Sequence, residues 1–123
     1  MKKILLIDDE ESIRSTLMDC LDSAGYAVEQ AENGRMALRL IEGTAYDLIV
    51  ADVFMPEVDG IELIQILNEE DSHPPIVVIS GGGGILPPNW SVKIAEMYGV
   101  AATLMKPIDM KVFLGSVEQA LHA

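Results

Sequence analysis

Five polar residues stand at the carboxyl ends of short apolar runs, where parallel strands of one sheet would bring them together. They supply three carboxylates, one hydroxyl and one ammonium. Crowded carboxylates repel one another, so either their pKa values rise or a cation balances their charge. The five residues are Asp8, Asp9, Asp52, Ser80 and Lys106.

The cation that fits Asp8 and Asp9 is Mg²⁺, which prefers hard oxygen ligands and often bridges carboxylates to phosphoryl oxygens. A transition metal is disfavoured because no histidine or cysteine ends a strand. His73 lies in a polar segment and His122 at the C-terminus, where we expect both to be solvated. Cys20 shares a helical pattern with apolar residues and is expected to be a buried structural thiol.

Asp52 ends a central apolar run and is the best candidate for a nucleophile, since a carboxylate can attack phosphorus and form an acyl phosphate. Phosphoryl transfer needs mainly positioning and charge stabilisation. Asp8 and Asp9 would hold the metal, while Lys106 would supply a cation and Ser80 a hydroxyl. The residue types therefore predict a phosphoryl-accepting site.

The elements that position these residues are predicted by the alternation of short aliphatic runs with segments of helical period. The first, third and fourth aliphatic runs are continuous, as is typical of strands covered on both faces, and should be central. The expected strands are residues 3–8, 27–31, 47–52, 75–80 and 102–106.

Five helices are expected to connect and follow these strands. Gly25, Gly43 and Gly99 mark helix ends, Asp109 is the expected N-cap of the last helix, and Asp9 taken alone fits the N-cap of the first. Right-handed crossovers give an α/β, flavodoxin-like doubly wound parallel sheet in the order 2-1-3-4-5, with ligands at the carboxyl ends of its strands. The expected helices are residues 10–24, 34–42, 60–69, 89–98 and 109–121.

Length and charge limit the functions open to this chain. Its 123 residues fit a single domain, 1–123, and no effector domain is expected beyond the last helix. The net charge of −12 disfavours nucleic acid and anionic membranes as partners, which leaves proteins and cations. With no membrane-length apolar run and no signal peptide in this sequence, we expect a soluble cytoplasmic protein.

The whole chain resembles the CheY-like receiver domains of bacterial two-component response regulators. The resemblance is carried by the Asp8-Asp9 pair, the segment from Asp52 to Asp59-Gly60, Ser80, and Lys106-Pro107. It implies that Asp52 is the phosphoacceptor and that Ser80 and Lys106 contact the phosphoryl group. It also implies Mg²⁺ ligands at Asp8, Asp9, Asp52 and the backbone carbonyl of Phe54, and a cis peptide bond before Pro107.

Partners follow from the same resemblance. It implies phosphorylation by a histidine kinase or a histidine phosphotransfer protein, and a change in affinity for a downstream protein through the face of helix 4, strand 5 and helix 5. The transfer is self-catalysed, so the chain is not expected to be an enzyme. Gly81 and Thr103 depart from the family's usual alanine and aromatic residue, so we expect signalling to run through residues 81–98, beginning in a mobile glycine loop, 81–84.

Three alternatives stay open at this point. An aspartate-nucleophile phosphatase would carry a second acid two residues after the nucleophile, where Phe54 stands. A phosphorylation-independent interaction module on the same fold would need neither metal nor phosphodonor. A receiver excised from a longer regulator would have the same site.

Overall fold

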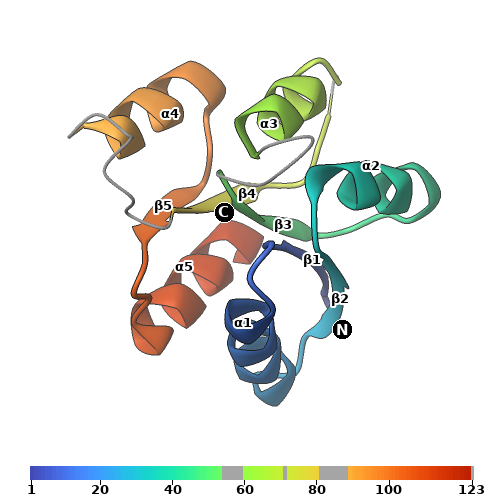
Figure 1. Cartoon of the computed structure of the whole chain (residues 1–123), viewed down its shortest axis with the longest axis vertical. Coiled ribbons are helices and arrows are strands. Elements are labelled where there is room, and N and C mark those ends of the chain that lie inside the picture. Colours follow the sequence, from blue (N-terminus) through green and yellow to red (C-terminus); the bar gives the residue numbers. More distant parts are fainter. Residues whose placement is uncertain (54–59, 71, 81–88, 123) are drawn as a thin grey trace.

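The computed structural model describes residues 1–53, 60–70, 72–80 and 89–122, and within them the strands form one parallel sheet in the order β2-β1-β3-β4-β5. This confirms the predicted fold and strand order. Helices cover both faces of the sheet, as Figure 1 shows. The strands are β1 (Lys3–Ile7), β2 (Ala27–Ala31), β3 (Leu48–Asp52), β4 (Ile76–Ser80) and β5 (Ala102–Met105).

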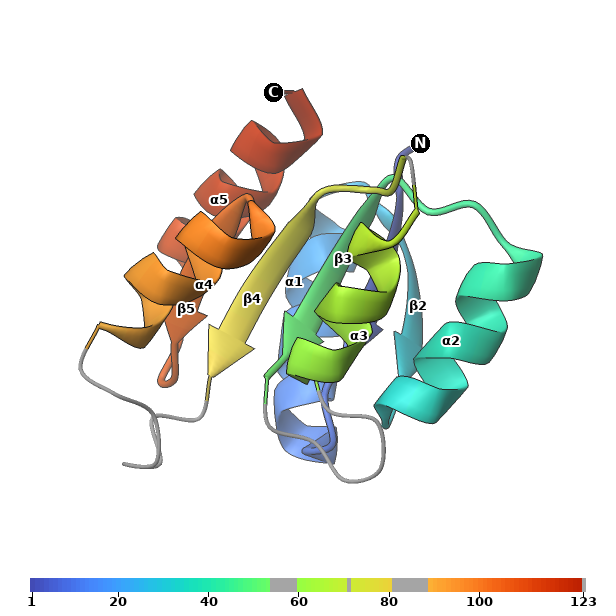
Figure 2. The same ribbon diagram turned by 90° about the horizontal axis from the view of Figure 1, so that it is seen from above.

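The five described helices divide into two groups. Figure 1 shows α1 and α5 on one face of the sheet and α2, α3 and α4 on the other. In Figure 2 the strand arrows all point the same way, so the carboxyl ends lie along one edge. None of the described helices is long and apolar enough to cross a membrane. The helices are α1 (Glu11–Ser23), α2 (Gly34–Gly43), α3 (Gly60–Asn68), α4 (Trp90–Tyr98) and α5 (Met110–His122).

Alternate residues of the central strands enter two separate apolar clusters. In β1, Leu5 and Ile7 belong to the cluster that includes residues of α2, α3 and α4. Ile4 and Leu6 belong to the cluster with α1 and α5, in which Phe113 is the largest buried side chain. One cluster covers each face of the sheet, so the side chains of the central strands are buried on both faces. For this reason β1, β3 and β4 are almost continuously aliphatic. Burial on both faces fixes the register, because a slip of one residue would exchange the two faces.

Side-chain and glycine caps set the helix ends. The Asp109 Oδ1 atom accepts hydrogen bonds from the backbone N–H groups of Lys111 (2.8 Å) and Val112 (3.2 Å), which confirms the predicted cap of α5. Gly25 and Gly99 adopt the positive φ angles, 93° and 64°, that favour glycine after a helix.

Two expected helix ends were wrong. Gly43, expected to follow the end of α2 at residue 42, is its last residue, and Thr44 is the C-cap in extended conformation. Glu10, not Asp9, is at the N-cap position of α1. The N-terminus of α2 also has a cap that sequence reasoning missed, since the Asn33 side chain accepts a hydrogen bond from the Met36 N–H at 2.8 Å.

A polar cluster ties together the opposite, amino-terminal edge of the sheet. The Tyr46 hydroxyl donates to Glu29 Oε2 at 2.7 Å, and the Lys3 ammonium lies 2.9 Å from Glu29 Oε1. The Lys3 N–H donates to Asp47 Oδ2 at 2.8 Å. Burial and then the bond to Glu29 raise the pKa of Tyr46 to about 12.

Replacing Tyr46 by Phe should lower the free energy of unfolding at neutral pH by about 1 kcal/mol, because Glu29 loses its phenol donor. An unfolded tyrosine ionises near pH 10. The folded state therefore binds one more proton between about pH 10 and the folded pKa of about 12, and wild type should lose stability there relative to Tyr46→Phe. Urea denaturation from pH 7 to 12 measures both effects.

Tyr26→Phe is the matched control, since no hydrogen bond joins the Tyr26 hydroxyl to another of the described residues. Equal pH profiles for wild type and Tyr46→Phe would contradict the account of this edge.

Candidate functional site

The strand register accounts for the position of the predicted polar residues. Ile7 pairs with Ala51, so the residues that follow, Asp8 and Asp52, lie at neighbouring strand ends. On the other side of β3, Ser80 ends β4 and pairs with Met105, so Lys106 is the next residue along β5. Backbone hydrogen bonds continue one residue beyond the ends of β1 and β5. Asp8 N donates to Ala31 O (3.2 Å), and Lys106 N donates to Ser80 O (2.7 Å). Asp8 and Lys106 therefore lie just outside the strands that were expected to contain them.

Three of these polar residues are buried. Asp8 and Ser80 are fully buried and Asp52 is 2% exposed. Burying two neighbouring carboxylates costs free energy unless a positive charge compensates them. A cation is therefore required at this edge of the sheet.

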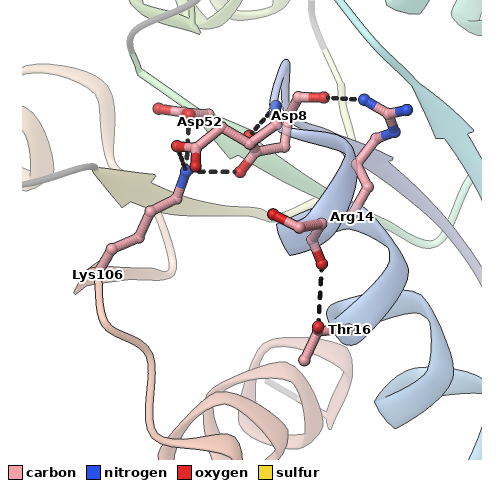
Figure 3. Close-up of polar contacts among 7 residues, drawn as sticks. Asp8, Arg14, Thr16, Asp52 and Lys106 are labelled. Carbon is pink, nitrogen blue, oxygen red and sulfur yellow. Dashed lines mark hydrogen bonds and ion pairs between the residues drawn. The ribbon is translucent and has the colours of Figure 1, made fainter.

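The Lys106 ammonium supplies that positive charge. Its Nζ atom lies 2.9 Å from Asp8 Oδ2, 3.2 Å from Asp52 Oδ2 and 2.8 Å from Glu10 Oε1. Figure 3 shows the side chain of Lys106 reaching across to the carboxylates of Asp8 and Asp52. The Lys106 side chain is only 9% exposed, so these contacts are largely shielded from water.

Two opposed effects act on the pKa of Lys106. Burial lowers it, while the hydrogen bonds to Glu10 and Asp8 and the attraction of Asp52 raise it. The carboxylates outweigh burial, so the pKa of Lys106 is raised above its ordinary value. Lys106 is therefore positively charged at neutral pH.

Backbone and side-chain contacts hold Asp8 in place. Its Oδ1 atom accepts a hydrogen bond from the Glu10 N–H at 2.9 Å, and its backbone carbonyl accepts one from Arg14 Nη1 at 2.8 Å, as Figure 3 shows. Arg14 also donates through Nε to Gln30 Oε1 at 3.1 Å. Sequence reasoning missed Arg14, because a contact between an arginine and a backbone carbonyl leaves no pattern in the chain.

The carboxylates fit a divalent cation. One oxygen from each of Asp8, Asp9, Glu10 and Asp52 lies within 4.8 Å of the others. Asp8 Oδ2 is buried, and within the described part of the chain the Lys106 ammonium at 2.9 Å compensates its charge. Hard oxygen donors in such a cluster suit Mg²⁺, and the exposed Asp9 and Glu10 leave it open to solvent. Sequence reasoning did not single out Glu10.

Some of the predicted residues lie outside the part of the chain that the structure describes. Phe54, Asp59 and the glycine run 81–84 lie outside the described residues. The peptide bond between Lys106 and Pro107 is cis, as the family resemblance implied. Thr103 is half-buried in β5, where it pairs with Val78 of β4.

The residues expected to take no part in chemistry lie away from the carboxylates. Burial raises the pKa of the partly buried Cys20 thiol, in keeping with its predicted structural role. His73 precedes β4, at the opposite edge of the sheet from Ser80, and one of its ring nitrogens lies 2.8 Å from the Pro74 carbonyl oxygen. His73 is half-buried, so the expectation that it is solvated holds only in part.

Comparison with known sequences gives one consistent result. A family model described as the response regulator receiver domain matches residues 4–118. The chain is 46% identical over 69 residues to the alkaline phosphatase synthesis transcriptional regulatory protein PhoP of Bacillus subtilis, covering 56% of this chain and 29% of PhoP. It is 39% identical over 71 residues to the response regulator receiver protein CpdR of Brucella abortus, covering 58% of this chain and 59% of CpdR. The matched segments thus span less than two thirds of either relative.

Solved structures agree with the sequence matches. The chemotaxis response regulator CheY4 of Vibrio cholerae superposes with a TM-score of 0.85 at 29% identity, covering 98% of both chains. The receiver domain of a signal transduction histidine kinase from Syntrophus aciditrophicus gives a TM-score of 0.87 at 28% identity, covering 99% of this chain and 91% of that one.

The excess of carboxylates over ammonium at this site should be measurable as a loss of stability without metal. Replacing Asp52 by Asn removes one repelling charge and should raise the melting temperature of the metal-free protein by several degrees. This corresponds to a gain of about 1 kcal/mol in the free energy of unfolding. Lys106→Met removes the compensating charge and should lower it. Added Mg²⁺ should raise the melting temperature of wild type, because it binds only the folded cluster.

Asp19→Asn is the control, since Asp19 is exposed on α1. A metal-free Asp52→Asn protein that melts no higher than wild type would count against repulsion within the cluster.

Proposed function

The chain belongs to the response regulator receiver domain family and acts as a receiver in two-component signalling, and from this premise we propose that Asp52 is its phosphoacceptor. The single observation that carries the proposal is the convergence of buried Asp8 and Asp52 on the Lys106 ammonium. A carboxylate nucleophile, neighbouring acids and a fixed cation are the groups that phosphoryl transfer to an aspartate requires.

Each residue has a distinct part in this proposal. An Asp52 carboxylate oxygen attacks the phosphorus of the donor, and the bond from phosphorus to the donor's leaving atom breaks. Lys106 stabilises negative charge on the phosphoryl oxygens, and the Ser80 hydroxyl donates to another of them. Asp8 and Asp9, with Asp52 and the backbone carbonyl of Phe54, would hold Mg²⁺, which when bound neutralises charge on the carboxylates and the phosphoryl group.

Lys106 must change partners during this reaction. In the metal-free site its ammonium compensates Asp8 and Asp52 directly. With a divalent cation bound, Asp8 and Asp52 would attract the Lys106 ammonium less strongly. Lys106 would then be available to the oxygens of the incoming phosphoryl group.

The proposed donor is a histidine kinase or a histidine phosphotransfer protein, and the output is a changed affinity for a downstream protein. Phosphorylation and dephosphorylation are self-catalysed, so the chain has no turnover on a separate substrate. The net charge of −12 supports protein partners rather than nucleic acid or membrane lipid. We propose a cytoplasmic location and a single receiver domain over residues 1–123.

Replacing Asp52 by Asn should abolish covalent labelling by acetyl phosphate and Mg²⁺, because an amide is a far weaker nucleophile toward phosphorus than a carboxylate. Intact-mass spectrometry of wild type and variant measures the addition of one phosphoryl group. Asp19→Asn should label like wild type and is the control for the charge change.

Equal labelling of the Asp52→Asn protein would refute the assignment. A wild-type chain that takes up no phosphoryl group would favour the interaction module on the same fold. Release of phosphate from a generic phosphoester would revive the phosphatase alternative.

We place the output surface on α4, β5 and α5. Large apolar side chains are exposed on each of these elements: Met97 of α4 is 69% exposed, Met105 of β5 is 55% exposed and Val112 of α5 is 54% exposed. Exposed apolar groups on neighbouring elements are typical of protein contact surfaces. Met105 follows the Thr103 position by two residues and directly precedes Lys106, so this surface adjoins the predicted site.

Saturation with Mg²⁺ and beryllofluoride, a mimic of a phosphoryl group on aspartate, should change amide hydrogen exchange most in residues 81–98, which include α4. The physical reason is that the Ser80 hydroxyl, immediately before this segment, should move toward the phosphoryl group. Changes confined to α2 or α3 would place the output surface elsewhere.

A further inference from the structure

We propose that Glu10 is a positioning residue that competes with the phosphoryl group on Asp52 for the Lys106 ammonium. The inference deepens the proposed function and rests on it. Glu10 Oε1 is the closest of the three carboxylate oxygens around Lys106 Nζ, at 2.8 Å. It is also the one partner of these three that does not belong to the predicted set of metal ligands.

The environment of Glu10 differs from that of the other two carboxylates. Its side chain is 54% exposed, whereas those of Asp8 and Asp52 are at most 3% exposed. Glu10 therefore retains most of its hydration and does not require Lys106 for compensation. Lys106 can therefore give up its contact with Glu10 at a small cost in free energy.

The backbone keeps the Glu10 carboxylate beside the site. Glu10 is at the N-cap position of α1, but its side chain caps no backbone group of the helix. Its N–H donates to Asp8 Oδ1 at 2.9 Å, which fixes the turn from β1 into α1. The carboxylate is thus held near Lys106 by the same turn that positions Asp8, and it performs no other described structural task.

Glu10 and the phosphoryl oxygens would compete for the Lys106 ammonium once a metal ion is bound. With a divalent cation bound, Asp8 and Asp52 would hold Lys106 less strongly, whereas Glu10 would keep its contact with the ammonium. The phosphoryl oxygens then have to take the ammonium from Glu10. Removing the Glu10 carboxylate should release Lys106 and stabilise the phosphorylated state, and also any complex with a phosphoryl mimic.

The test compares beryllofluoride affinity, at saturating Mg²⁺, for wild type, Glu10→Gln and Glu11→Gln. Glu11 is the adjacent exposed acid in the first turn of α1, so its variant makes the same change of charge. We expect Glu10→Gln to bind beryllofluoride about two- to fivefold more tightly than Glu11→Gln, the range expected for loss of a partly exposed ion pair. Isothermal titration calorimetry measures both affinities.

Two further measurements separate competition from other roles of Glu10. Glu10→Asp keeps the charge but shortens the side chain, and it should bind beryllofluoride as Glu10→Gln does. The affinity for Mg²⁺ alone should fall modestly in Glu10→Gln, which loses a charge close to the carboxylate cluster, whereas Glu10→Asp, which keeps that charge, should bind Mg²⁺ like wild type.

Three outcomes would overturn the inference. Equal beryllofluoride affinities for Glu10→Gln and Glu11→Gln would show that the contact with Lys106 has no effect. Weaker binding by Glu10→Gln would show that Glu10 supports the phosphorylated state. A loss of Mg²⁺ affinity in Glu10→Asp as well as in Glu10→Gln would make Glu10 a metal ligand. A wild-type protein that binds no beryllofluoride would instead overturn the proposed function itself.

Discussion

Burial of two neighbouring carboxylates beside a single ammonium is the constraint on which the rest of this structure depends. Asp8 and Asp52 lie out of water, where each charge alone would cost several kcal/mol. Lys106 offsets that cost through contacts of 2.9 and 3.2 Å. Asp52 ends β3, while Asp8 and Lys106 directly follow β1 and β5, so the geometry of the sheet must be maintained for the charges to meet.

The doubly wound topology supplies that geometry. After β1 the chain forms α1, β2 at the edge of the sheet and α2, and it then adds β3 on the other side of β1. β1 and β3 are therefore neighbours, and Asp8 and Asp52 lie side by side at their carboxyl ends. Buried aliphatic residues on both faces of β1, β3 and β4 prevent a change of register. Apolar packing therefore determines the distances within a polar site, although none of the packing residues takes part in the chemistry.

Sequence patterns were sufficient for the sheet and for most of the polar residues at its edge. The strand-end rule located Asp52 and Ser80 because both follow continuous apolar runs, and it placed Asp8 and Lys106 to within one residue of their strands. Glu10 and Arg14 could not be found in this way, because their contacts depend on the reach and rotamer of long side chains. The cluster of Tyr46, Glu29 and Lys3 was missed for the same reason, since its members join different segments of the chain.

The central claim is that Lys106 compensates Asp8 and Asp52 in the metal-free protein and transfers to the phosphoryl group in the phosphorylated one. A pair of crystal structures, metal-free and with Mg²⁺ and beryllofluoride, tests this claim most directly. The account predicts that the Lys106 ammonium contacts both carboxylates in the first structure, and that it contacts a fluoride on Asp52 in the second. An ammonium that keeps its contacts with Asp8 and Asp52 in both structures would contradict it.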